Sequence, residues 1–191
     1  MHARFDTMRG IERVLIRGKL DQARDFARTL STGPELPFAP WAAQVALVRE
    51  RAAAVATATG IDDACRKTAR LAEACANCHA QTGAQILFRK PPPLLADQPD
   101  VVTRMVRHQW AADRIWEGMV GDSSEPWRAG LDVMAAAPLA WPKIGPDRVG
   151  LAQRLQQLAD QGRHTSPDDR AERARLYGEL LVTCAACHSA P

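Results

Sequence analysis

Cys75-Ala76-Asn77-Cys78-His79 returns 109 residues later as Cys184-Ala185-Ala186-Cys187-His188. The segments that precede the two motifs also correspond, because residues 70–74 and 179–183 lie at the same offset. Residues 11–18 correspond to residues 115–122 at an offset of 104, so about five residues were inserted in the second copy. Repeats of about 100 residues are whole domains and are too long for the units of a solenoid.

Glycine and proline residues divide each copy into four helical segments. Only 5% of the residues are aromatic, and this composition favours helices over strands. We expect helices at residues 2–17, 20–30, 40–59 and 62–83, and again at 99–120, 124–137, 147–161 and 166–191. The sequence therefore predicts an all-α protein made of two tandem four-helix bundle units, each with Cys-x-x-Cys-His on its last helix.

Three consecutive prolines mark the boundary between the copies. They follow Arg89-Lys90 as Pro91-Pro92-Pro93, and a helix cannot continue through them. The sequence therefore predicts a first helical unit at residues 1–90, a Pro-rich linker at 91–98 and a second helical unit at 99–191.

Composition excludes several classes of protein. The chain has 191 residues, of which 46% are hydrophobic and 25% charged, so it is not a disordered protein. Its apolar runs are far shorter than the 18 or so residues that a transmembrane helix needs. The net charge is +3, with +5 on residues 1–95 and −2 on residues 96–191, which lacks the basic block of a nucleic-acid-binding protein.

The Cys-x-x-Cys-His spacing is the attachment signature of a c-type haem. Residues i and i+3 present both thiols on one face of a helix, where they bond to the two vinyl groups of the macrocycle. The adjacent imidazole then lies beneath the iron as its fifth ligand. Two motifs predict two covalent haem c groups with their irons, held by Cys75, Cys78, His79, Cys184, Cys187 and His188.

Zinc and a redox dithiol are the alternative interpretations of the cysteine pairs. Zinc ribbons separate their two pairs by about 15–20 residues, whereas these pairs are about 105 residues apart. A redox dithiol belongs in a βαβ context, which this sequence lacks, and neither alternative explains the histidine after each pair. The fifth cysteine, Cys65, has Ala174 as its equivalent, so we expect a small buried side chain there.

A helical unit with Cys-x-x-Cys-His on its last helix is similar to the cytochrome c′ and c-556 type bundles. The twofold arrangement resembles bacterial diheme c-type cytochromes in which such a unit is duplicated. This resemblance implies a periplasmic or exported electron carrier with one haem in each copy. The chain begins at Met1 without a signal peptide, so we expect that this segment was removed or that the start codon was assigned inside a longer gene.

His108 is the candidate sixth ligand of the second haem. Met105, His108, Ala112, Ile115 and Met119 form one stripe that we expect to face the core, and the resembling bundles build the distal side of the haem here. A histidine on an apolar face is often a core residue, but this copy has an iron that needs a ligand. Coordination by His108 would give a bis-histidine, low-spin haem that is closed to small gases.

The first copy lacks this histidine, because Arg4 occupies the equivalent position. His2 and Met8 are the nearest substitutes, and an open or water-bound site is the third possibility. A methionine ligand would raise the potential of this haem relative to a bis-histidine partner. We expect His164 to be a solvated loop residue.

These features predict an electron-transfer protein that exchanges electrons with other redox proteins through exposed haem edges. One alternative is a haem-based gas-binding or gas-sensing protein with one open coordination position, and another is a structural zinc-binding protein. We expect no enzyme activity, since no acid, base and arginine constellation of a diheme peroxidase accompanies either motif. The oligomeric state stays open.

Overall fold

A computed structural model describes residues 2–33, 39–84, 86, 88–138 and 145–189 of the chain. Within these ranges the chain forms eight α-helices and one 3-10 turn, with no strand, which confirms the all-α class. No helix among the described residues is both long and apolar enough to cross a membrane.

The helices of the first half follow the glycine and proline pattern closely. They are α1 (His2–Ile16), α2 (Leu20–Thr32), the 3-10 turn η1 (Ala39–Trp41), α3 (Ala42–Ala56) and α4 (Ile61–Thr82). Gly18 ends the turn after α1 at φ 69°, and Gly83 caps α4 at φ 64°, a left-handed conformation that glycine adopts without strain.

The second half contains α5 (Val101–Val120), α6 (Ser124–Ala135), α7 (Pro146–Arg163) and α8 (Arg170–Ser189). The Asp100 carboxylate caps α5 by accepting from the Thr103 amide at 2.8 Å. α8 begins four residues later than the expected start at Ser166. The physical reason is that the Asp169 carboxylate accepts from the Glu172 amide at 3.0 Å, which makes Asp169 the cap of this helix.

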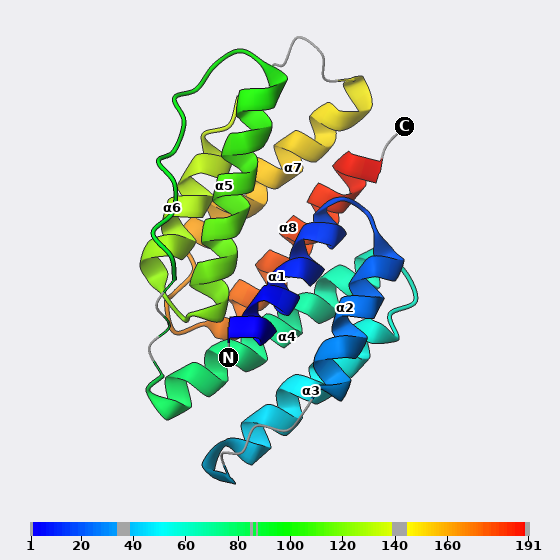
Figure 1. Ribbon diagram of the computed structural model, residues 1–191. Helices are drawn as coiled ribbons and strands as arrows, with labels where there is room; N and C mark the ends of the chain where they lie inside the picture. The colour runs from blue at the N-terminus through cyan, green and yellow to red at the C-terminus, as the bar shows by residue number, and fades with distance from the viewer. Residues whose placement is uncertain (1, 34–38, 85, 87, 139–144, 190–191) are drawn as a thin grey trace.

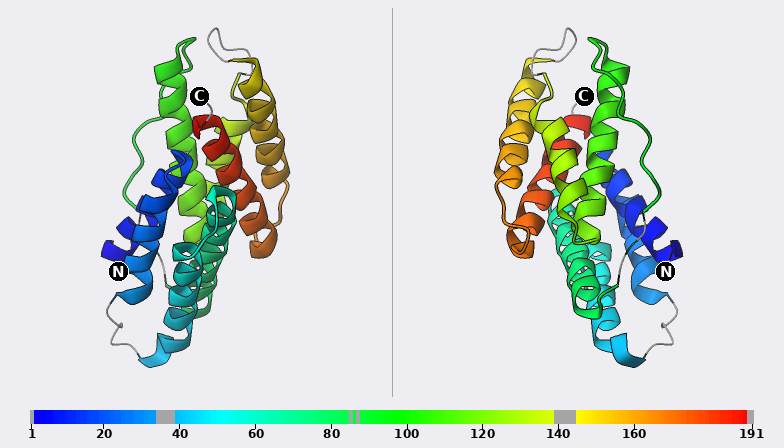
Figure 2. Two further views of the ribbon diagram at one scale, coloured as in Figure 1. Left: turned by 90° about the vertical axis from the view of Figure 1, so that its right-hand side faces the viewer. Right: turned by 90° about the vertical axis from the view of Figure 1, so that its left-hand side faces the viewer.

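Helices that are neighbours in the sequence pack on one another in both halves. α1 to α4 do so in chain order and α5 to α8 do so in chain order, while α1 also contacts α4 and α5 also contacts α8 (Figures 1 and 2). The segment before α5 runs along this helix, where the Trp110 indole donates to the carbonyl of Pro92 at 2.8 Å. The chain division at residues 91–98 stays a prediction.

The two halves meet mainly through α4 and α8, which run antiparallel across the middle of the molecule (Figure 1). α1 contacts α8, and its equivalent α5 contacts α4, so the contacts between the halves occur in matched pairs. Gly18 and Asp122, which lie at the repeat offset of 104, both have positive φ angles, 69° and 52°. This pattern is that of an internal twofold axis.

The core is built from the expected apolar faces. On α1 Met8, Ile11 and Leu15 are buried, and on α5 Ile115 and Met119 are buried. The stripe predicted on α5 is only partly interior, because Met105, His108 and Ala112 are half-buried. Trp116 and Tyr177 contact each other where α5 meets α8, with ring centroids 6.0 Å apart.

α5 and α6 approach each other closely at Gly118. A Cβ at this position would overlap the backbone nitrogen and Cα of Trp127. We expect Gly118→Ala to lower the free energy of unfolding by about 1–3 kcal/mol, because the clash exceeds the better helix propensity of alanine. Urea denaturation measures this effect. The matched control is Gly150→Ala in α7, where a Cβ meets open space and stability should rise by up to about 1 kcal/mol. Equal stability of the two variants would contradict the close packing.

Candidate functional site: two Cys-x-x-Cys-His helix ends

The first motif occupies the last turns of α4. Cys75 is buried, whereas Cys78 and His79 are half-buried. The Sγ atom of Cys75 lies 3.5 Å from the Sδ atom of Met8 in α1. The motif therefore lies where α1 and α4 pack together, with one thiol inside the core and the second nearer the surface.

A hydrogen bond fixes the imidazole of His79. Its Nδ1 atom lies 2.8 Å from the carbonyl oxygen of Val120, the last residue of α5. A carbonyl only accepts, so Nδ1 is the protonated nitrogen and donates this bond. Nε2 is then the basic nitrogen that can bind a metal. Histidine ligands of metals characteristically donate their other ring N–H to a carbonyl in this way.

The second motif occupies the equivalent turns of α8, with Cys184 and Cys187 half-buried and His188 exposed. The end of α8 lies against the end of α1, because a Cβ at Gly18 would overlap the hydroxyl of Ser189. The part of His188 that the protein covers is enough for desolvation to lower the pKa of its imidazole, and the charges of Arg148 and Arg17 lower it further. Each motif therefore lies beside the C-terminal end of the first helix of the other half.

His108 on α5 and His188 on α8 lie on two helices that contact each other in the second half. Burial lowers the pKa of His108 to about 4, and the positive form of His188 is the next largest cause, followed by Arg107 and Arg104. The His108 imidazole is therefore neutral at physiological pH, which is the form that binds metals. The charge of the motif histidine on α8 thus acts on the predicted ligand on α5.

The predicted ligands of the first motif are His2 and Met8, both on α1. His2 belongs to α1, but its side chain lies outside the described residues. Met8 lies against the motif through its contact with Cys75. His164 is exposed at the end of α7, as expected, and its Nδ1 lies 2.8 Å from the Asp160 carbonyl oxygen.

The two motifs lie at opposite ends of the antiparallel pair α4 and α8 (Figure 1). All five cysteines are free thiols. Among the described residues, no group of three or more His, Cys, Asp or Glu side chains is arranged to hold a metal ion. The cysteine pairs therefore do not come together as one four-cysteine zinc site.

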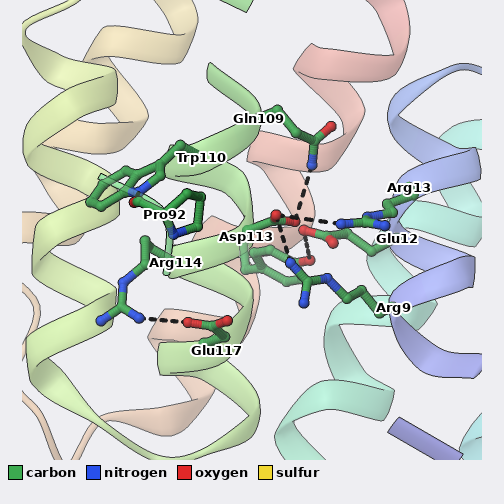
Figure 3. A network of polar contacts seen from close by, with 10 residues as sticks. Arg9, Glu12, Arg13, Pro92, Gln109, Trp110, Asp113, Arg114 and Glu117 are labelled. Atoms are coloured by element: carbon green, nitrogen blue, oxygen red, sulfur yellow. Dashed lines mark hydrogen bonds and ion pairs between the residues drawn. The ribbon is translucent and has the colours of Figure 1, made fainter. Parts of the chain in front are cut away.

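A polar network lies between α1, α5 and α8 (Figure 3). It was not predicted from the sequence. Glu12 is fully buried and its Oε1 accepts a hydrogen bond from the Tyr177 hydroxyl at 3.2 Å. Burial raises the pKa of Glu12 to about 8, and the neighbouring Asp113 adds to this effect. A sequence signal exists, since Glu12 lies one turn after Met8 on an otherwise apolar face.

Comparison with known proteins gives no relative: no family model, no curated protein and no solved structure matches this chain.

The motif thiols should differ in reactivity in the cofactor-free chain. Burial raises the pKa of Cys65, Cys75 and Cys184 to about 12, and it also raises the pKa of the less buried Cys78 and Cys187. We expect iodoacetamide at pH 8 to label Cys78 and Cys187 first, and faster as the pH rises, because the accessible thiolate reacts. Peptide mass spectrometry measures the order. In denaturant all five should react alike, and early labelling of Cys75 in the folded chain would contradict the arrangement.

Proposed function

We propose that this protein is a diheme c-type cytochrome that transfers electrons, with one haem c on each four-helix half. The observation that carries the proposal is the arrangement of His79. It follows two thiols at the i and i+3 positions of a helix end, and its Nδ1–H is held by the Val120 carbonyl. Nε2 is thereby left to bind iron. The second motif has the same Cys-x-x-Cys-His sequence, so we infer the same role for His188.

The residues present fit this cofactor. Cys75 and Cys78 would hold the first haem and Cys184 and Cys187 the second, through thioether bonds. Their pairs lie on the faces of single helices, so each pair can reach two neighbouring vinyl groups. When bound, the haem irons supply the chemistry by cycling between Fe(III) and Fe(II). The chain orients them through His79 and His188.

His108 is the proposed sixth ligand of the second iron. Its neutral imidazole and its place on a helix that contacts α8 support a bis-histidine site, which is low-spin and closed to gases. The first iron takes His2 or Met8. An open first site is the basis of the alternative function, a gas-binding protein, and the observation that favours it is Arg4 at the position equivalent to His108.

The proposed partners are other redox proteins, which dock through small interfaces near the exposed haem edges. Haem attachment to this motif in the resembling proteins implies a periplasmic or exported location. Electron transfer of this kind needs no acid–base constellation, so the proposal includes no enzyme activity.

Removal of the thiols should remove the haems one at a time. The chain is expressed with an export signal and a haem-maturation system, and intact mass and the reduced pyridine-haemochrome spectrum count the haems. We expect two in the natural sequence and one in each of the double variants Cys75→Ala/Cys78→Ala and Cys184→Ala/Cys187→Ala. Cys65→Ala is the matched control, since it removes a buried cysteine outside the motifs and should keep two haems. No covalent haem, with bound zinc instead, would refute the proposal.

Loss of His108 should open the second site. In the diheme protein we expect His108→Ala to convert about half of the haem absorption to a high-spin form that shifts with carbon monoxide, because one of two irons loses its sixth ligand. His164→Ala is the control, because this histidine is exposed at the end of α7, where its Nδ1 lies 2.8 Å from the backbone carbonyl oxygen of Asp160. An unchanged low-spin spectrum in His108→Ala would exclude this ligand assignment.

A further inference from the structure

A carboxyl group lines the interior of the second half. Glu12, although it belongs to α1, lines a narrow cavity together with Tyr177, Leu181 and Cys184 of α8 and with Ala112 and Ile115 of α5. Glu12 and Cys184 are close enough for the carboxylate charge to raise the pKa of the thiol. Since Cys184 is an attachment thiol in the proposed function, Glu12 lies beside the second haem site.

The hydrogen bonding of Glu12 is incomplete. Its side chain is 0% exposed, and Oε1 accepts from the Tyr177 hydroxyl at 3.2 Å. Oε2 has no hydrogen-bond partner among the described atoms. A buried carboxylate needs a cation or several donors to offset its lost hydration, and one tyrosine does not supply them.

The nearby arginines form ion pairs with Asp113 and not with Glu12 (Figure 3). The guanidinium of Arg9 lies 2.6 Å from Asp113 and that of Arg13 lies 3.5 Å from it, and the Gln109 amide donates to Asp113 at 3.1 Å. Burial and the negative charge of Asp113 raise the pKa of Glu12, whereas the two arginines lower it. The raising effects are the larger ones. Both arginines thus pair with Asp113, and among the described residues no ion pair involves Glu12 itself.

The other charged groups that face this region lie on α4, α5 and α8, and burial raises the pKa of Glu117 among them. On α5, Arg114 pairs with Glu117 at 2.6 Å. On α8, the pKa of Tyr177 is raised well above its usual value, mainly by burial. On α4, burial holds the pKa of Cys65 at about 12, so this thiol is protonated. The pKa of Glu12, which burial raises to about 8, places the change of its charge near neutral pH.

The arrangement is particular to one half. Trp116 occupies the position equivalent to Glu12, and Thr68 occupies the position equivalent to Tyr177. Both are buried, and neither carries a carboxyl group. The second half therefore has no carboxyl group at the position equivalent to Glu12.

We propose that Glu12 is a redox-linked proton site, which binds one proton when the second haem accepts an electron and releases it when that haem is oxidised. This inference rests on the proposed function. The electron comes from a redox partner and reduces Fe(III) to Fe(II), and the proton comes from water and converts the carboxylate to the carboxylic acid. No other bond forms or breaks, and the net charge of the site is unchanged.

The sign of the effect follows from electrostatics. An added electron makes a nearby buried carboxylate less favourable, so reduction raises the affinity of Glu12 for a proton. By linkage, protonation of Glu12 favours reduction by the same factor. The reduction equilibrium of the second haem should therefore become less favourable as the pH rises through about 8, by up to tenfold per pH unit. For a one-electron couple this limit is 59 mV.

Spectroelectrochemical titration of the diheme protein between pH 6 and pH 10 tests the proposal, and the variant Cys75→Ala/Cys78→Ala assigns the second haem. We expect the second potential to fall with pH in the natural sequence and to be flat in Glu12→Gln. Tyr177→Phe removes the donor that favours the charged form, so the fall should move to higher pH. Glu179→Gln, at a half-buried residue of α8 that pairs with Arg66, is the control and should keep the fall.

The outcomes separate the two proposals. A chain without covalent haem overturns both of them. A diheme chain whose second potential is flat, or whose pH dependence survives in Glu12→Gln, overturns only the assignment of Glu12. Infrared difference spectra provide a second measurement if Glu12→Gln does not fold: a protonated carboxyl band should appear on reduction at pH 8 and shift in Tyr177→Phe.

Discussion

Gly178 in α8 packs on Ala69 in α4, and these two residues are equivalents in the repeat. A contact between equivalent positions occurs where an internal twofold axis passes through an interface. The Arg66 guanidinium donates to Glu179 at 2.8 Å beside this crossing. α4 and α8 are antiparallel here. The motif at the end of α4 therefore lies beside α5, and the motif at the end of α8 lies beside α1. His79 reaches Val120 in this way, so the histidine of the first motif is held by a carbonyl of the second half.

The repeat has diverged at the positions that line these sites. In the first half Met8 fills the space beside Cys75, whereas the equivalent Ala112 leaves a cavity beside Cys184. The two halves share one order of helix contacts, and different residues on α1 and α5 make the surroundings of the two motifs unequal. Under the proposed function, these differences would give the two haems different reduction potentials, because burial and nearby charge change the reduction potential of a haem iron.

Local signals in the sequence predict the helices well. Glycine and proline residues predict where the helices begin and end within a few positions. α8 begins later than predicted because Asp169, one of several possible caps, accepts the hydrogen bond from Glu172. The contact of α4 with α8 joins residues more than 100 positions apart, and periodicity carries no information about such pairs. The partner of His79 is unpredictable for the same reason, whereas Glu12 gives a signal as a charged residue on an apolar face.

The antiparallel crossing also separates the two sites. His79 lies ten residues beyond Ala69, and His188 lies ten residues beyond Gly178. A helix rises 1.5 Å per residue, so the two histidine backbones are about 30 Å apart along the helix pair. Each motif end therefore faces its own part of the surface. For the proposed electron carrier, this separation favours two docking surfaces over one shared entry point, and the proton site at Glu12 then acts on one of the two alone.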